Sequence, residues 1–217
     1  MPVEKSILIV MVVFVVFLFM GIVVLNNLYK QLKVNEAQLK KDLDELTLKL
    51  QERTTQAFLS PVSGLPNLLG SQARIDDMFD RYERGVVKKV TVVWIDLYKF
   101  KPVNDEYGHP KGDKVLMIAG KLLLHSVRHS DIVIHFSGDE FGIICADTEK
   151  VEIEAILVRA NTALAEYDFT FAKEGKVNTK FCFGIAESDK YHNTFYKLRD
   201  VAEDDCMNVK KRSGESR

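Results

Sequence analysis

The chain has 217 residues, a formal net charge of −1 at neutral pH, and three cysteines. Without a globally basic surface, nucleic-acid binding is not the expected role, so we expect no nucleic-acid partner. The cysteines are odd in number and widely spaced, with no Cys-x-x-Cys pair. This pattern favours free thiols in a reducing compartment over a disulfide framework or a zinc site.

The N-terminal segment from Ile7 to Leu25 is an unbroken apolar run without charge. Its length matches the roughly 20 residues that cross a bilayer as a helix. The small residues that mark a signal-peptide cleavage site are missing after it. Lysines follow the run, so the positive-inside rule places the rest of the chain in the cytoplasm. We expect a retained single-pass anchor over residues 1–26, with too few residues before it for an external sensing domain.

Residues 27–58 contain neither Gly nor Pro, and leucines recur from Leu28 to Leu50, mostly at steps of three or four. This spacing is typical of a two-stranded coiled coil. Successive four-residue steps at Leu39 and Leu43 indicate local unwinding of the supercoil. We expect a parallel dimerisation helix that pairs identical chains. A single amphipathic helix, or pairing with a separate membrane sensor protein, remains the alternative.

Residues 59–217 have the length of one domain with a single core. Pro61 disfavours helix at Ser60 and ends the preceding helix. The patterns then predict a helix at 67–84, a strand at 89–96, helices at 99–106 and 111–129, a hairpin, a helix at 148–167, a strand at 179–186 and a helix at 193–212. This order predicts an α+β fold of the βαββαβ type, with helices on one face of an antiparallel central sheet.

The predicted hairpin, Ile132–Cys145, reads IVIHFSGDEFGIIC and carries Asp139 and Glu140 at its tip. Adjacent carboxylates repel each other unless a cation lies between them. The upstream strand ends at Asp96, and hard cations take several carboxylate or carbonyl oxygens. We expect the three carboxylates to converge on a shared divalent cation. For the Asp-Glu pair alone, a solvated acidic turn is the alternative.

Together these segments resemble the GGDEF-domain diguanylate cyclases. The matching pieces follow the family's order and spacing: SGLPN at Ser63–Asn67, IDLYKFKPVNDEYGH at Ile95–His109, GD at Gly112–Asp113, RHSD at Arg128–Asp131 and SGDEF at Ser137–Phe141. The resemblance covers roughly residue 59 to the C-terminus and implies a nucleotide-cyclase-like palm.

The implied reaction joins two GTP molecules into cyclic di-GMP and releases pyrophosphate, with Mg²⁺, or Mn²⁺ in its place, as the cofactor. The product has two-fold symmetry, so the implied catalyst is a homodimer of facing half-sites at the bacterial inner membrane. A dimerising helix upstream would raise the effective concentration of one half-site near the other.

The resemblance also assigns roles to residues of the metal and phosphate site. Asp96 and Asp139, with the Leu97 carbonyl, hold the metal. Either Asp139 or Glu140 accepts the proton of the 3′-hydroxyl, a choice the sequence leaves open. The groups that contact the triphosphate are the side chains of Lys101 and Lys210 and the backbone amides of Lys99 and Phe100.

Asn104 and Asp113 match the family's guanine readers. A carboxylate accepts both N1–H and N2–H of guanine, whereas adenine would leave Asp113 unpaired, so GTP is favoured over ATP. His109 lies near the base or closes its turn. Arg128 and Asp131 match the inhibitory site that binds the product, since the Arg fork bonds guanine edges and phosphate bidentately.

Six residues depart from the usual ones outside the metal carboxylates, the guanine readers and Lys101: Ser60, Leu68, Tyr98, His135, Ser137 and Gly214. Ser137 stands where Gly lets the backbone approach a nucleotide, so we expect weakened rather than abolished activity. Ser60 replaces an Asp and Leu68 an Arg, and we expect these losses to be linked. His135 replaces an Arg. A catalytically degenerate domain that binds cyclic di-GMP or GTP and regulates a partner remains the alternative.

Overall fold

The computed structural model describes residues 2–212, apart from the side chains of residues 2–6, 10 and 56. Helix α1 runs without interruption from Pro2 to Phe58. The chain divides into two compact units, Met1–Thr54 and Thr55–Arg217. By length and composition, α1 is apolar enough over part of its course to cross a membrane. The division into an anchor at 1–26 and a coiled coil at 27–58 stays a prediction, because the helix continues through residue 26.

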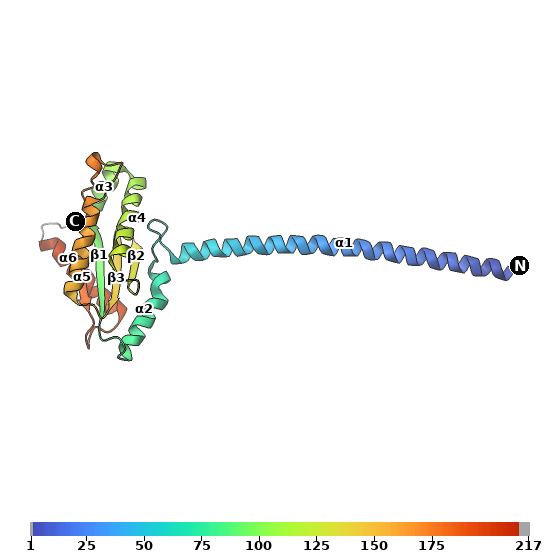
Figure 1. Ribbon diagram of the computed structural model, residues 1–217, viewed down its shortest axis with the longest axis horizontal. Coiled ribbons are helices and arrows are strands. Elements are labelled where there is room, and N and C mark those ends of the chain that lie inside the picture. Colours follow the sequence, from blue (N-terminus) through green and yellow to red (C-terminus); the bar gives the residue numbers. More distant parts are fainter. Residues whose placement is uncertain (1, 213–217) are drawn as a thin grey trace. The chain divides into compact units, whose positions relative to one another are not determined.

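The C-terminal unit is built on a four-stranded antiparallel sheet in the order β2-β3-β1-β4 (Figure 1). The strands are β1 (Val90–Tyr98), β2 (Ile132–Ser137), β3 (Glu140–Ala146) and β4 (Lys180–Glu187). The helices are α2 (Leu68–Glu83), α3 (Phe100–Tyr107), α4 (His109–Ser126), α5 (Lys150–Glu166) and α6 (Phe195–Arg212), with a 3₁₀ turn at Lys173–Gly175. The predicted α+β palm is confirmed.

The helices cover both faces of the sheet, so the expectation that they lie on one face is wrong. In β1, Val93, Ile95 and Leu97 pack with α3, α4 and α5, whereas Val92 and Trp94 pack with α2 and α6. Successive side chains of a strand point to opposite faces. A strand that is apolar at nearly every position therefore needs cover on both sides.

The β2–β3 hairpin bends just before its tip. The pairing shifts between His135 and Ser137, and Gly138 adopts a positive φ of +54°. An extra residue in one strand of an antiparallel pair bends that strand and re-aims the side chains beyond it. The hairpin tip thus comes to lie beside the C-terminal end of β1.

Candidate active site

The C-terminal end of β1 lies against the hairpin tip. Asp96 is the cross-strand partner of Glu140 in β3 and of Cys182 in β4. Directly opposed residues in an antiparallel pair project from the same face, here the face covered by α2 and α6. The Leu97 amide donates to the Asp139 carbonyl at 3.0 Å, which ties the turn to the strand. The structure therefore brings Asp96 close to Glu140 and to the backbone of Asp139.

Asp96 is buried, with 6% of its surface exposed, and its Oδ1 lies 2.6 Å from Lys210 Nζ. Lys210 reaches this position because α6 packs close to β4. A Cβ at Gly184 would collide with the Ala202 carbonyl and the Cys206 amide of α6. The lysine that the resemblance assigned to the triphosphate thus contacts the expected metal-binding carboxylate in this structure.

Glu140 is half-buried, and that burial raises its pKa; the nearby carboxylates of Asp139, Asp96 and Glu203 raise it further. A hydrogen bond donated by Ser137 Oγ to Glu140 Oε2, at 3.2 Å, opposes the shift. Glu203 of α6 is not among the site residues predicted from the sequence. Its position two helical turns before Lys210, on the same side of α6, is the signal that could have pointed to it.

The donors at this site suit a hard divalent cation, because carboxylate and carbonyl oxygens are what Mg²⁺ and Mn²⁺ prefer. Asp96 already has a positive partner in Lys210. Across residues 2–212, however, no three His, Cys, Asp or Glu side chains lie together as a metal-holding group. The expected convergence of three carboxylates on one ion is therefore not found. The metal ligands that the resemblance implies are Asp96, Asp139 and the Leu97 carbonyl, and these include only two carboxylates.

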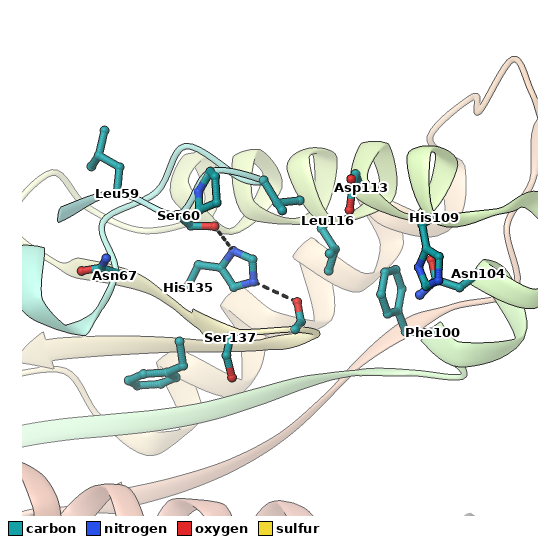
Figure 2. A pocket seen from close by; sticks show the side chains of 14 residues that line it. Leu59, Ser60, Asn67, Phe100, Asn104, His109, Asp113, Leu116, His135 and Ser137 are labelled. Atoms are coloured by element: carbon teal, nitrogen blue, oxygen red, sulfur yellow. Dashed lines mark hydrogen bonds between the residues drawn. The ribbon is translucent and has the colours of Figure 1, made fainter. Parts of the chain in front are cut away.

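A cavity of about 440 Å³ adjoins the hairpin tip (Figure 2). Asn104 and Asp113 line it together with Phe100, His109 and Gly138. Its volume lies within the range of roughly 300–1,000 Å³ that is usual for small-molecule sites. Both expected guanine readers thus lie in one cavity with the turn that precedes Asp139.

Gly112 makes room for Asn104 in this cavity. A Cβ at position 112 would overlap the Asn104 side-chain oxygen. Asn104 is half-buried, while Asp113 is exposed to solvent within the cavity wall. The glycine of the GD pair therefore fixes the place of one reader, and the aspartate supplies the other.

The start of α3 carries the remaining expected phosphate contacts. Lys99 precedes the helix in a left-handed conformation with φ 59°, and Phe100, the first helical residue, is 8% exposed. The first amides of a helix have no intrahelical partner and favour anions. Lys101 is exposed on the same turn. The Tyr98 ring contacts two ammonium groups, with its centroid 5.1 Å from Lys99 Nζ and 5.0 Å from Lys180 Nζ.

Arg128 and Asp131 lie at the start of β2, at the other end of that strand from the hairpin tip. Arg128 is exposed, whereas Asp131 is 6% exposed, and its Oδ2 accepts a hydrogen bond from the Arg128 amide at 2.9 Å. Burial raises the pKa of the neighbouring Cys145 thiol, and Asp131 raises it further. In this structure the Asp131 carboxylate closes its own turn, and the product-binding role of the pair stays a prediction.

Two of the unusual residues contact each other, and they are not the pair we expected. Ser60 Oγ lies 2.7 Å from His135 Nδ1. Leu68 instead packs against the apolar cluster beneath α2 and α6. Ser60 is therefore linked to His135, because the hairpin, rather than the start of α2, lies opposite it. Gly214 lies outside the described residues.

An antiparallel sheet between two helical layers, with an acidic hairpin beside the end of its central strand and a nucleotide-sized cavity, defines a nucleotide-cyclase-like palm. Residues 57–217 match the family model described as diguanylate cyclase, GGDEF domain. The chain therefore belongs to the GGDEF family.

Relatives of known name match parts of the chain. Diguanylate cyclase DgcP of Pseudomonas aeruginosa is 31% identical over 125 residues, which are 58% of this chain and 18% of that protein. The cyclic di-GMP phosphodiesterase PdeR of Escherichia coli is 35% identical over 103 residues, 48% of this chain and 15% of that protein. The chain thus spans less than a fifth of the length of either relative.

Solved structures share the fold. The coiled coil and GGDEF domain of DgcB from Caulobacter crescentus, in complex with c-di-GMP, superposes with a TM-score of 0.69 at 17% identity, covering 84% of this chain and 95% of that one. The GGDEF domain of PA1120 from Pseudomonas aeruginosa gives a TM-score of 0.60 at 24% identity, covering 69% and 92%.

Proposed function

We propose that this chain is a diguanylate cyclase that condenses two GTP molecules into cyclic di-GMP. The observation that supports this most strongly is the pairing of Asp96 with Glu140 across β1 and β3, beside Asp139. The cavity with Asn104 and Asp113 adjoins the same turn. Nucleotidyl transfer from GTP needs groups that neutralise phosphate charge beside a cavity that can take the nucleotide, and the carboxylates of Asp96 and Asp139 lie next to such a cavity.

The chain's own residues would bind and orient the nucleotide. Asp113 accepts N1–H and N2–H of guanine, Asn104 bonds its N3 edge, and Lys101 with the first amides of α3 neutralises the triphosphate. Asp96 and Asp139 would hold Mg²⁺ or Mn²⁺, which would neutralise phosphate charge when bound. Asp139 or Glu140 would take the proton of the 3′-hydroxyl.

We place this activity in a homodimer anchored at the inner membrane, with residues 1–26 as anchor, 27–58 as dimerisation helix and 59–217 as the cyclase domain. The exposed leucines of α1, among them Leu32, Leu39, Leu43 and Leu46, support the pairing of two helices. Cyclic di-GMP binding at Arg128 and Asp131 would limit the reaction.

The test is to incubate the full chain, in detergent micelles, with GTP and Mg²⁺ and to quantify cyclic di-GMP by mass spectrometry. We expect product from the wild type, none from Asp139→Ala, and wild-type yield from Asp77→Ala, a control at an exposed carboxylate of α2. ATP in place of GTP should give no cyclic dinucleotide. Full activity in Asp139→Ala would refute the proposal.

A second candidate is a binding module without turnover. The departures at Ser137 and His135 favour it, and so does a relative that is named as a phosphodiesterase rather than a cyclase. In that case calorimetry on the full chain would show binding of cyclic di-GMP or GTP, while the product assay would detect no cyclic di-GMP. Detectable turnover would exclude this candidate.

A further inference from the structure

His135 joins two segments that are far apart in the chain. Its Nδ1 lies 2.7 Å from Ser60 Oγ (Figure 2). The same nitrogen lies 2.8 Å from Ser63 Oγ, and Nε2 lies 2.9 Å from the Gly138 carbonyl. The ring is 3% exposed and stacks on Phe141 with centroids 4.4 Å apart. A single buried side chain thus connects the segment after α1 to the tip of the acidic hairpin.

These contacts define the proton positions on the ring. A carbonyl oxygen can only accept, so Nε2 carries a proton and donates it to Gly138. In the neutral ring, Nδ1 then accepts from a serine hydroxyl, one at a time because it has one lone pair. The hydroxyl oxygens in turn accept from the backbone, Ser60 Oγ from the Ser63 amide at 3.4 Å and Ser63 Oγ from the Leu65 amide at 3.2 Å. Burial lowers the pKa of His135, with only the Gly138 carbonyl and Asp139 opposing it.

The hydrogen bond from His135 to the Gly138 carbonyl restrains the next residue, Asp139, which we propose as a metal ligand. The peptide that joins Gly138 to Asp139 is planar. A hydrogen bond that holds its oxygen therefore also fixes the positions of the Asp139 nitrogen and Cα. Gly138 itself adopts a positive φ, a conformation that glycine reaches without steric cost. On the other side of Asp139, its carbonyl accepts from the Leu97 amide at 3.0 Å. Asp139 is therefore held by one hydrogen bond before it and one after it.

The segment at residues 59–66, which contacts the other side of the His135 ring, is also held by backbone hydrogen bonds. The His135 amide donates to the Pro66 carbonyl at 3.0 Å, and the Ser60 amide donates to the Leu65 carbonyl at 2.8 Å. Leu59 forms a bridge with Pro66. The turn from residue 59 to residue 66 is thus a fixed frame to which the ring is attached. The same frame lines the cavity that holds Asn104 and Asp113.

We propose that His135 is a positioning residue, which aims the Asp139 carboxylate by holding the Gly138 carbonyl while Ser60 and Ser63 hold its ring. This inference rests on the proposed function for its effect on turnover, but not for its effect on the turn itself. The two unusual residues Ser60 and His135 then form a neutral substitute for the Asp and Arg that are usual at these positions.

The test uses the full chain and three kinds of variant. His135→Phe keeps an aromatic ring that can stack on Phe141 but loses every side-chain hydrogen bond of His135. Ser60→Asp combined with His135→Arg restores the usual pair of residues. Ser71→Ala is the control, because this buried serine hydroxyl has no partner among the residues that the structure describes. Thermal midpoints are recorded for all.

The first readout is amide hydrogen exchange in peptides that contain residues 136–141 and Leu97. We expect faster exchange there in His135→Phe, wild-type exchange in Ser71→Ala, and more protection in the double variant than in His135→Phe. Unchanged exchange in His135→Phe, or acceleration spread evenly over the domain, would overturn the proposal.

The second readout separates kcat from KM for GTP. A misplacement of about 1 Å costs roughly 100-fold in rate, so we expect kcat of His135→Phe to fall about 10- to 100-fold while KM changes by less than about 3-fold. A rise in KM alone would overturn the proposal. If the wild type makes no cyclic di-GMP but the turn loosens in His135→Phe, the proposed function fails and the positioning of Asp139 by His135 stands.

Discussion

Replacing Lys210 with methionine removes the ammonium that lies 2.6 Å from the buried Asp96 carboxylate. The two side chains are 17% and 9% exposed, so both charges are largely desolvated. Removing one partner of a buried pair costs about 3–5 kcal/mol, because the other charge stays buried without compensation. The residual exposure of Lys210 places our expectation at the lower end, at about 3 kcal/mol of unfolding free energy.

Urea unfolding followed by tryptophan fluorescence measures this cost. Trp94 is the only tryptophan, and it lies buried against Phe136 with ring centroids 4.6 Å apart, so its emission reports on the C-terminal unit. Lys211→Met, one residue further along α6 and exposed, is the matched control. We expect that control within about 0.5 kcal/mol of the wild type, as for an ordinary surface change.

A double-mutant cycle with Asp96→Asn completes the test. If the loss comes from the uncompensated carboxylate, the neutral asparagine should recover much of it. Added Mg²⁺ should also recover part of the loss in Lys210→Met alone, since the ion gives Asp96 another positive partner. Equal stabilities for Lys210→Met and Lys211→Met would show that Lys210 does not compensate the buried charge of Asp96.

Three further predictions concern the cavity that Asn104 and Asp113 line and the buried His135. Gly112→Ala should displace Asn104 and raise KM for GTP by roughly 10-fold with a smaller change in kcat, and an unchanged KM in steady-state kinetics would contradict this. Asp113→Asn should narrow the preference for GTP over ATP when the two nucleotides are tested for competition, whereas a retained preference would count against Asp113 as the reader. Because burial lowers the pKa of His135, the unfolded chain binds a proton that the folded chain does not, so the wild type should lose stability as pH falls below about 6.5, by at most about 1.4 kcal/mol per pH unit. His135→Phe should lack this component in urea titrations at pH 5–7, and identical slopes for both proteins would exclude it.

Most of the fold could be predicted because the sequence patterns are local. The β-branched run that forms β1 and the paired runs around Gly138 carry the strand signal in their own residues. The strands and helices lie within a few residues of their predicted bounds. The second helical layer was not predicted. Its signal is that neighbouring residues of β1, such as Val93 and Trp94, are both apolar and point to opposite faces, so both faces of the strand need cover.

Contacts between distant segments could not be predicted in the same way. Nothing in the local pattern around Ser60 names His135 as its partner, because the contact depends on how the turn at 59–66 meets the hairpin. Likewise, Lys210 was assigned by resemblance to a phosphate, and the packing of α6 on Gly184 places it on Asp96. Such pairings follow from tertiary packing, on which single-sequence propensities carry no information.

We propose that Asp96 and Asp139 hold one divalent cation for a guanosine triphosphate. Titration of the full chain with Mn²⁺ in the presence of a non-hydrolysable GTP analogue, followed by electron paramagnetic resonance, measures that ion directly. We predict bound Mn²⁺ in the wild type and its loss in both Asp96→Asn and Asp139→Asn, with binding retained in Asp77→Asn. Wild-type Mn²⁺ affinity in either of the first two variants would show that the substituted carboxylate does not hold the ion.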